Sequence, residues 1–376
     1  MLFRRYKIRL LPTEEQANKM WEHVHACRFI WNYMLERQNE LQKQGKKWVS
    51  YIDMAHELTN VKARPQYNWL KSVSNASLQA ECRLLEEAYR AFFKGSRGHP
   101  RYKSRKKSSF SFSARTKTFR ALQGEVVHIE KVGKVGYQTD LPISQYGKFY
   151  DVQIMYVHGK WLACFSVKRE KQARILSEAC MGIDLGVKEL ATVACGNQCW
   201  VYPNINKSPQ VKRQVSRLKH LQRKAARKYV KNHTKDKSKN IERIERQIGK
   251  AFFRLANFRR DYRHKVTHEL VEFLPSRIVM ESLDVASMLK NRMLAEKIQA
   301  QGFYEFISMM RYKSEERGIE FVQADRYFPS SKRCCCCGKV KRDLTLKDRI
   351  YQCSGCGLVI DRDHNAAINL MNYSHT

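Results

Sequence analysis

This sequence has few acidic residues, no long apolar stretch and no export signal. Its 36 Asp and Glu residues stand against 71 Lys and Arg, a formal net charge of +35 over 376 residues. No segment approaches the roughly 20 apolar residues of a membrane-spanning helix, and residues 1–5 lack the apolar region of a signal peptide. A membrane partner is therefore disfavoured. So large a positive charge predicts a polyanionic partner, and nucleic acid fits best.

Disulfide bonds are not expected either. Six of the twelve cysteines lie between residues 334 and 356, and the other six are scattered. Without an export signal, this distribution favours a reducing cytoplasm and thiolate metal ligands. The scattered cysteines are expected to be small buried residues: Cys27, Cys82, Cys164, Cys180, Cys195 and Cys199. The length predicts two or three domains, and 43% hydrophobic residues are enough to bury a core.

The clustered cysteines contain two Cys-x-x-Cys pairs separated by 15 residues, a spacing typical of a structural zinc site. The predicted ligands are Cys334, Cys337, Cys353 and Cys356. Cys335 and Cys336 stand where polar spacers are usual, which leaves the ligand register open, but Gly338 and Gly357 follow the second cysteine of each pair and favour this set. Four thiolates leave no open position for water, so the zinc is expected to hold together a ribbon with too few apolar residues to fold alone.

The N-terminal part predicts a strand, helices and a small β domain. Residues 1–11 alternate as a strand, and Thr13 with Gln16 predicts a capping box at the start of a long helix. A second helical pattern covers residues 77–93 and places Leu84 on its apolar face. From residue 125 to residue 168 the period changes to two, with a hairpin turn at residues 158–160.

A basic run at residues 94–107 separates the helices from this β domain. It admits two interpretations, a solvated linker or a loop that contacts phosphates. The charge of the whole chain favours the second, because Lys and Arg release counterions from the backbone they neutralise.

The second half of the chain alternates apolar strands with helices. A long basic helical hairpin is predicted over residues 208–268, between two strand segments that both carry acidic residues, and is expected to lie beside the same site. The predicted strands cover residues 182–191, 277–282 and 319–325, and a last helix starts near residue 363.

Three acidic residues fall at the ends of these elements or within them. Asp184 interrupts an apolar strand, where an unpaired carboxylate is costly to bury, although a structural ion pair would also explain it. Glu281 ends a strand, where an exposed Glu is common, and Asp363 could be only a helix cap. Together the three predict a Mg²⁺ site, because Mg²⁺ takes oxygen ligands and two-metal phosphodiester hydrolysis needs several converging acids.

The acidic segments resemble the three RuvC motifs of the TnpB family. They are Gly-Ile-Asp-Leu-Gly at residues 182–186, Ile-Val-Met-Glu-Ser-Leu at 278–283 and Asp-Arg-Asp-His-Asn-Ala-Ala at 361–367. Residues 328–334 resemble that family's lead into its zinc ribbon, and residues 6–13 its N-terminal strand and helix start. The similarity therefore covers essentially the whole chain.

The resemblance implies an RNA-guided DNA endonuclease of an insertion sequence, related to type V CRISPR effectors. Such a protein binds guide RNA from the transposon end and cleaves double-stranded DNA beside a short transposon-adjacent motif. By motif, Asp184, Glu281 and Asp363 hold magnesium, with Asp361 as the alternative third ligand. The implied fold is an RNase H-like RuvC domain (176–330 and 358–376) with an inserted zinc ribbon (331–357) that binds target nucleic acid. A small β-barrel or wedge domain (1–12 and 108–175) and a helical recognition domain (13–107) precede it. The implied location is a prokaryotic cytoplasm or nucleoid.

Two other functions are compatible with parts of the sequence. A transposase that joins strands would use the same metal pair. A zinc-ribbon regulator without catalysis is disfavoured, because a protein that binds polyanions gains nothing from buried carboxylates. The oligomeric state is left open. We expect the zinc ribbon to determine how Asp363 meets Asp184 and Glu281.

Overall fold

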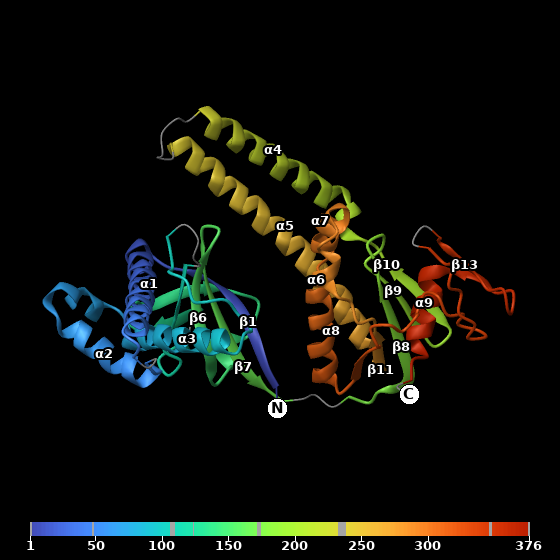
Figure 1. Cartoon of the computed structure of the whole chain (residues 1–376), viewed down its shortest axis with the longest axis horizontal. Coiled ribbons are helices and arrows are strands. Elements are labelled where there is room, and N and C mark those ends of the chain that lie inside the picture. The colour runs from blue at the N-terminus through green and yellow to red at the C-terminus, as the bar shows by residue number, and fades with distance from the viewer. Residues whose placement is uncertain are drawn as a thin grey trace. The chain divides into compact units, whose positions relative to one another are not determined.

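The computed structural model describes residues 2–46, 49–105, 110–122, 124–170, 174–231, 238–345 and 348–374. The chain divides into two compact units, Met1–Arg169 and Glu170–Thr376 (Figure 1). Within the described residues, no helix is long and apolar enough to cross a membrane.

The first unit is a seven-stranded antiparallel sheet with helices packed on it, and both contribute to one core. Ile8 and Phe112 from the sheet share that core with Met20 and Leu35 from the first helix. The strand order is β2-β6-β7-β1-β5-β4-β3. The elements are β1 (Leu2–Leu11), α1 (Glu14–Lys43), α2 (Tyr51–Ala63), η1 (Pro65–Ser72), α3 (Asn75–Phe93), β2 (Phe110–Ser113), β3 (Arg120–Leu122), β4 (Val126–Ile129), β5 (Gly133–Gln138), η2 (Ile143–Gln145), β6 (Phe149–Val157) and β7 (Lys160–Arg169).

The local predictions for this unit are largely confirmed. The Thr13 side chain accepts a hydrogen bond from the Gln16 backbone N–H, and the Gln16 side chain accepts one from the Thr13 N–H, which makes the predicted capping box. The predicted hairpin is β6 and β7. Leu84 is a correction, because 41% of it is exposed, while Leu85 beside it is buried.

The second unit is built on a five-stranded sheet in the order β10-β9-β8-β11-β12. β8, β11 and β12 are parallel neighbours, while β9 and β10 run antiparallel. The predicted basic hairpin is α4 and α5, and the polar break predicted at residues 232–238 lies mostly outside the described residues. The elements are β8 (Ser177–Leu185), β9 (Ala191–Cys195), β10 (Gln198–Tyr202), η3 (Ile205–Lys207), α4 (Pro209–Lys231), α5 (Lys239–Glu272), β11 (Pro275–Met280), α6 (Val285–Met288), α7 (Arg292–Gln301), α8 (Phe303–Arg317), β12 (Glu320–Gln323), β13 (Ile350–Gln352), β14 (Val359–Asp361) and α9 (Arg362–Met371).

The two faces of this sheet are covered by different helices. Met181, Ile183 and Met280 pack into a core with residues of α5 and α8. Val279, which precedes Met280 in β11 and therefore points to the other face, packs instead with Leu370 of α9. Because successive side chains of a strand point to opposite faces, Gly182 and Asp184 belong to the face that α9 covers. Figure 1 shows α9 lying along β8 and β9.

Gly182 lets α9 approach β8 unusually closely. A Cβ atom placed on Gly182 would lie 2.1 Å from the Ala367 carbonyl oxygen and 2.3 Å from the Met371 nitrogen, both backbone atoms of α9. No side chain fits in that space, so the helix backbone rests directly on the strand. This contact sets the distance between the strand and the helix that carries Asp363.

We expect Gly182→Ala to lower the free energy of unfolding by about 1–3 kcal/mol or more, the usual cost of overpacking, because backbone cannot move aside as a side chain can. Thermal and denaturant unfolding would measure it. Gly147→Ala is the control, since a Cβ there meets nothing within 4 Å. Equal stability of the two variants would contradict the close helix contact.

Candidate functional site

The three predicted acids converge at one edge of the second sheet. In the parallel pair β8 and β11, Ile183 is the register partner of Met280. Asp184 and Glu281 each follow one of these partners, so they lie side by side at the carboxyl ends of their strands. Asp363, in the first turn of α9, lies near enough to Asp184 for its negative charge to raise the pKa of Asp184. All three are half-buried.

This convergence makes Asp184 hard to ionise. The pKa of Asp184 is raised well above its usual range, chiefly because the carboxylate is withdrawn from water, and further because the Glu281 and Asp363 carboxylates lie nearby and Glu281 hydrogen-bonds it. Among the described residues, none of the three acids forms an ion pair. A cluster of like charges is unfavourable. Among the described residues, however, the four predicted zinc ligands, and not these acids, are the one group whose donor atoms lie close enough together to hold a metal ion.

Asp361 has a different role from Asp363. It is the N-cap of α9, where its Oδ1 accepts hydrogen bonds from the backbone N–H groups of Asp363 (2.8 Å) and His364 (3.2 Å). That cap satisfies two donors that the first helical turn cannot pair itself. Capping therefore occupies an oxygen of Asp361, whereas the side chain of Asp363 is not used for it.

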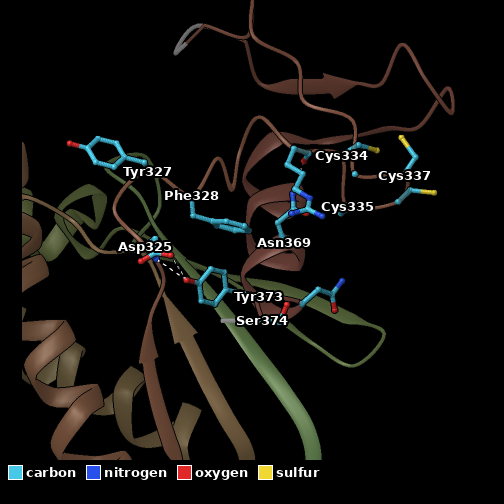
Figure 2. A pocket seen from close by; sticks show the side chains of 13 residues that line it. Asp325, Tyr327, Phe328, Cys334, Cys335, Cys337, Asn369, Tyr373 and Ser374 are labelled. Atoms are coloured by element: carbon cyan, nitrogen blue, oxygen red, sulfur yellow. Dashed lines mark hydrogen bonds between the residues drawn. The ribbon is translucent and has the colours of Figure 1, made fainter. Parts of the chain in front are cut away.

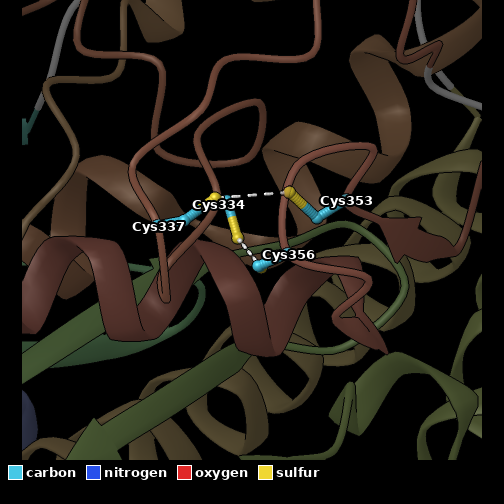
Figure 3. Close-up of side chains that lie close together, drawn as sticks. All are labelled: Cys334, Cys337, Cys353 and Cys356. Carbon is cyan, nitrogen blue, oxygen red and sulfur yellow. Dashed lines mark hydrogen bonds between the residues drawn. The ribbon is translucent and has the colours of Figure 1, made fainter.

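The four predicted zinc ligands lie together, as Figure 3 shows. Cys334 Sγ is 3.6 Å from Cys356 Sγ, Cys337 Sγ is 3.5 Å from Cys353 Sγ, and all four sulfurs lie within 4.8 Å of one another. A tetrahedral zinc with Zn–S bonds of about 2.3 Å separates its sulfurs by about 3.8 Å. The sulfurs therefore fit zinc. They form the one group of at least three donors within that distance among the described residues.

The two cysteine pairs have matching backbone turns. Gly338 N–H donates to the Cys334 carbonyl and Gly357 N–H to the Cys353 carbonyl, at 3.0 and 3.1 Å. Both glycines have positive φ, 77° and 74°, which only glycine adopts readily. The predicted ligand register is thus supported, and Cys336 is exposed outside the group. The backbone N–H groups of Cys356 and Gly355 bond the Cys353 sulfur and lower its pKa to about 6. The Leu358 backbone lowers the pKa of Cys356, but burial and the other three cysteine side chains outweigh this and raise that pKa to about 12.

Of the six scattered cysteines, Cys27, Cys82 and Cys164 are buried as predicted. Cys180 and Cys195 are half-buried, and Cys199 is exposed because β10 is an edge strand of the second sheet. The prediction is wrong for Cys199.

Sequence reasoning missed the residues that join the zinc ribbon to the acids. The buried Asn365 donates to the Arg333 carbonyl (2.7 Å) and accepts from the Cys335 N–H (3.0 Å). Asn369 donates to the carbonyls of Ser330 (2.8 Å) and Arg333 (2.6 Å). The Ser330 hydroxyl in turn donates to Glu281. One signal was present: the two asparagines are four residues apart, so they share one face of α9.

The described part of the basic run is fixed to the first unit and is not a free linker. Trp31 Nε1 donates to the Arg101 carbonyl at 3.0 Å, and the Asn32 side chain bonds both backbone groups of Lys103, at 3.0 and 2.7 Å. Lys103 pairs with the buried Glu81 and lies 4.1 Å above the Trp31 ring. Residues 106 and 107 lie outside the described residues. Lys103 is thus neutralised, whereas Arg97, Arg101 and Arg105 are exposed.

The hairpin α4 and α5 also carries exposed basic residues. Leu218 and Leu221 on α4 pack against Leu255 on α5, and this seam is the hairpin's own small core. The opposite side of α4 faces water and bears Arg213, Arg217, Lys219, Arg223, Lys224 and Arg227.

Three family models match the chain. The one described as "Cas12f1-like, TNB domain" matches residues 303–370, and the one described as "Probable transposase" matches residues 164–292. A third, described as "Helix-turn-helix domain", matches residues 1–47. In the described part of that last range the structure has strand β1 followed by one long helix, α1.

Relatives match along nearly the whole length. A protein named "Putative RNA-guided DNA endonuclease" from Streptomyces pristinaespiralis is 31% identical over 98% of this chain and 88% of its own. One named "Putative RNA-guided DNA endonuclease InsQ" from Escherichia coli K12 is 30% identical over 98% of this chain and 92% of its own. The solved structure titled "Structure of the mini-RNA-guided endonuclease CRISPR-Cas_phi3" matches the fold with a TM-score of 0.50 and 10% identity, covering 99% of this chain and 92% of that one.

We expect Cys353→Ser to lose stoichiometric zinc and to melt at a lower temperature, because three thiolates hold the metal less well and the ribbon depends on it. Zinc content by mass spectrometry and thermal unfolding measure both effects. Cys336→Ser is the matched control from the same cysteine cluster and should keep its zinc. If Cys336→Ser lost zinc and Cys353→Ser kept it, the ligand register given above would be wrong.

Proposed function

This chain belongs to the TnpB family, and from that premise we propose that it is an RNA-guided DNA endonuclease of an insertion sequence. In this proposal it binds guide RNA from the transposon end and cuts double-stranded DNA next to a short transposon-adjacent motif. The observation that carries the proposal is the meeting of Asp184, Glu281 and Asp363 at one sheet edge in a chain with a net charge of +35.

We propose that these three carboxylates hold magnesium. When bound, Mg²⁺ would supply the activation of water and the stabilisation of the leaving oxygen in phosphodiester hydrolysis. The chain's own residues set the donor arrangement. Ser330 holds Glu281 by a hydrogen bond, and Gly182 lets α9 bring Asp363 close to Asp184. The cap formed by Asp361 supports Asp363 as the third ligand.

The nucleic acids would be held through their phosphates. The exposed basic residues of α4 and the arginines of the fixed loop at residues 94–105 are available for this contact, and such contacts do not depend on sequence. We propose that base pairing with the guide selects the target, while the protein reads duplex shape and the short flanking motif. The first unit would supply the wedge and recognition parts, and the second the RuvC-like nuclease with its zinc ribbon.

The experiment is to purify the chain with co-expressed transposon-end RNA and to incubate it with plasmid libraries and Mg²⁺. We expect cutting that requires the RNA and a matching target beside a common flanking motif. Asp184→Ala should bind RNA as well as the wild type and cut at least about a hundred-fold more slowly, the lower end of the cost of removing one group that stabilises a transition state. Wild-type cutting no better than that of Asp184→Ala would refute the nuclease, and equal cutting without RNA would refute guidance. Joined strands instead of cut ends would indicate a transposase.

A second prediction separates the two aspartates of the last motif. Asp363→Asn should lose cutting because it removes a ligand charge. Asp361→Asn should keep most of it, because Asn is as good a helix N-cap as Asp. Cleavage rates of the two proteins, with circular dichroism as a check on folding, measure the difference. The reverse ranking would make Asp361 the third ligand.

A further inference from the structure

A cavity of about 660 Å³ lies beside the first cysteine pair in the second unit. Its walls come from the chain that leaves β12, from the first zinc turn and from the end of α9. Figure 2 shows Tyr327 on one side of the cavity and the cysteine-bearing loop on the other. Its volume is in the range of pockets that hold a small ligand. None of the three predicted metal-binding acids lines it.

The charge of this cavity differs from that of the chain. Among the described residues that line it, Arg333 is the one cation and Asp325 the one carboxylate. The cysteines of the first pair add negative charge when they bind metal as thiolates. A phosphate would therefore find little net attraction here, although much of the remaining surface is basic. The cavity is better suited to an uncharged group.

The lining offers a flat aromatic surface and polar groups at its edge. Phe328 and Tyr373 pack edge to face with ring centroids 4.9 Å apart, and the Tyr373 hydroxyl donates to Asp325 at 2.9 Å. Tyr327 is 89% exposed and forms no ring pair among the described residues. The amide of Asn372 completes the polar edge, since the amide N–H groups of Asn369 are already bonded to the Ser330 and Arg333 carbonyls. Aromatic faces with amide and carboxylate edges are the groups that recognise an unpaired nucleobase.

Hydrogen bonds link one lining residue of the cavity to Glu281. Asn369, which lines the cavity, bonds the Ser330 carbonyl, and the Ser330 hydroxyl bonds Glu281. Asn369 is six residues after Asp363 on α9, about 9 Å along the helix axis. That is the reach of a few nucleotides, since successive phosphates of one strand are spaced about 3.4 Å apart along a duplex.

We propose that this cavity binds an unpaired base of the DNA strand being cut, a few nucleotides from the scissile phosphate, with Tyr327 stacking on that base. The proposal rests on the nuclease function proposed above. Binding of this base would hold the strand on the side of the acids nearest the zinc ribbon, and would thereby position the phosphate to be cut.

The test measures binding and does not need cleavage. The full chain, purified with its transposon-end RNA, is titrated in Ca²⁺ with a single-stranded oligothymidylate that carries one 2-aminopurine. We expect fluorescence quenching in the wild type and in Tyr327→Phe, which keeps the ring. Tyr327→Ala should lose the quenching and bind roughly ten-fold more weakly, in line with the loss of one stacked base. Tyr304→Ala, at a tyrosine on α8 that is 77% exposed, is the control and should behave as the wild type.

Three results would overturn the proposal: unchanged quenching and affinity in Tyr327→Ala, equal affinity for an oligonucleotide whose probe position is abasic, or tighter binding of the same sequence as RNA. Failure of the nuclease function is distinguishable from these. A chain that never cuts DNA but still quenches the probe through Tyr327 would refute the nuclease and keep the site. A chain that cuts DNA but whose quenching does not depend on Tyr327 would keep the nuclease function and refute the site.

Discussion

The close contact of α9 with β8 at Gly182 is the constraint on which the second unit depends. The strand carries Asp184 two residues later, and the helix carries Asp363 four residues before Ala367, whose carbonyl faces Gly182. A side chain at this point would separate the two carboxylates by pushing the helix outward. Because β11 fixes Glu281 beside Asp184 through parallel register, the backbone contact at Gly182 determines how far Asp363 stands from that pair.

The zinc ribbon is joined to this arrangement through α9. Asn365 and Asn369 bond the chain just before and at the first cysteine pair, and Ser330 in that chain bonds Glu281. The hydrogen bonds of a buried amide cost free energy to break, because each lost partner leaves a polar group with neither protein nor water to bond. The helix therefore holds the ribbon on one side and the sheet on the other, and it orders the acids and the cysteines together.

Much of the fold could be predicted from the sequence because its signals are local. The capping box at Thr13, the β6–β7 hairpin and the basic helical hairpin follow from residue type and period. The cysteine register followed from spacing and two glycines. The prediction failed for Leu84 and Cys199, whose exposure depends on which elements happen to pack beside them. The roles of Ser330, Asn365 and Asn369 could not be predicted either, because their partners lie 30 to 49 residues away and polar residues on a short helix are usually solvated.

The asparagines of α9 recognise backbone atoms, and this has a consequence for sequence variation. The carbonyls of Ser330 and Arg333 and the N–H of Cys335 are groups that almost any amino acid supplies. Side chains between Ser330 and the first cysteine can therefore be exchanged without loss of the amide contacts. The side chains of Ser331 and Lys332 can thereby be redesigned while the backbone of this segment stays bonded to α9.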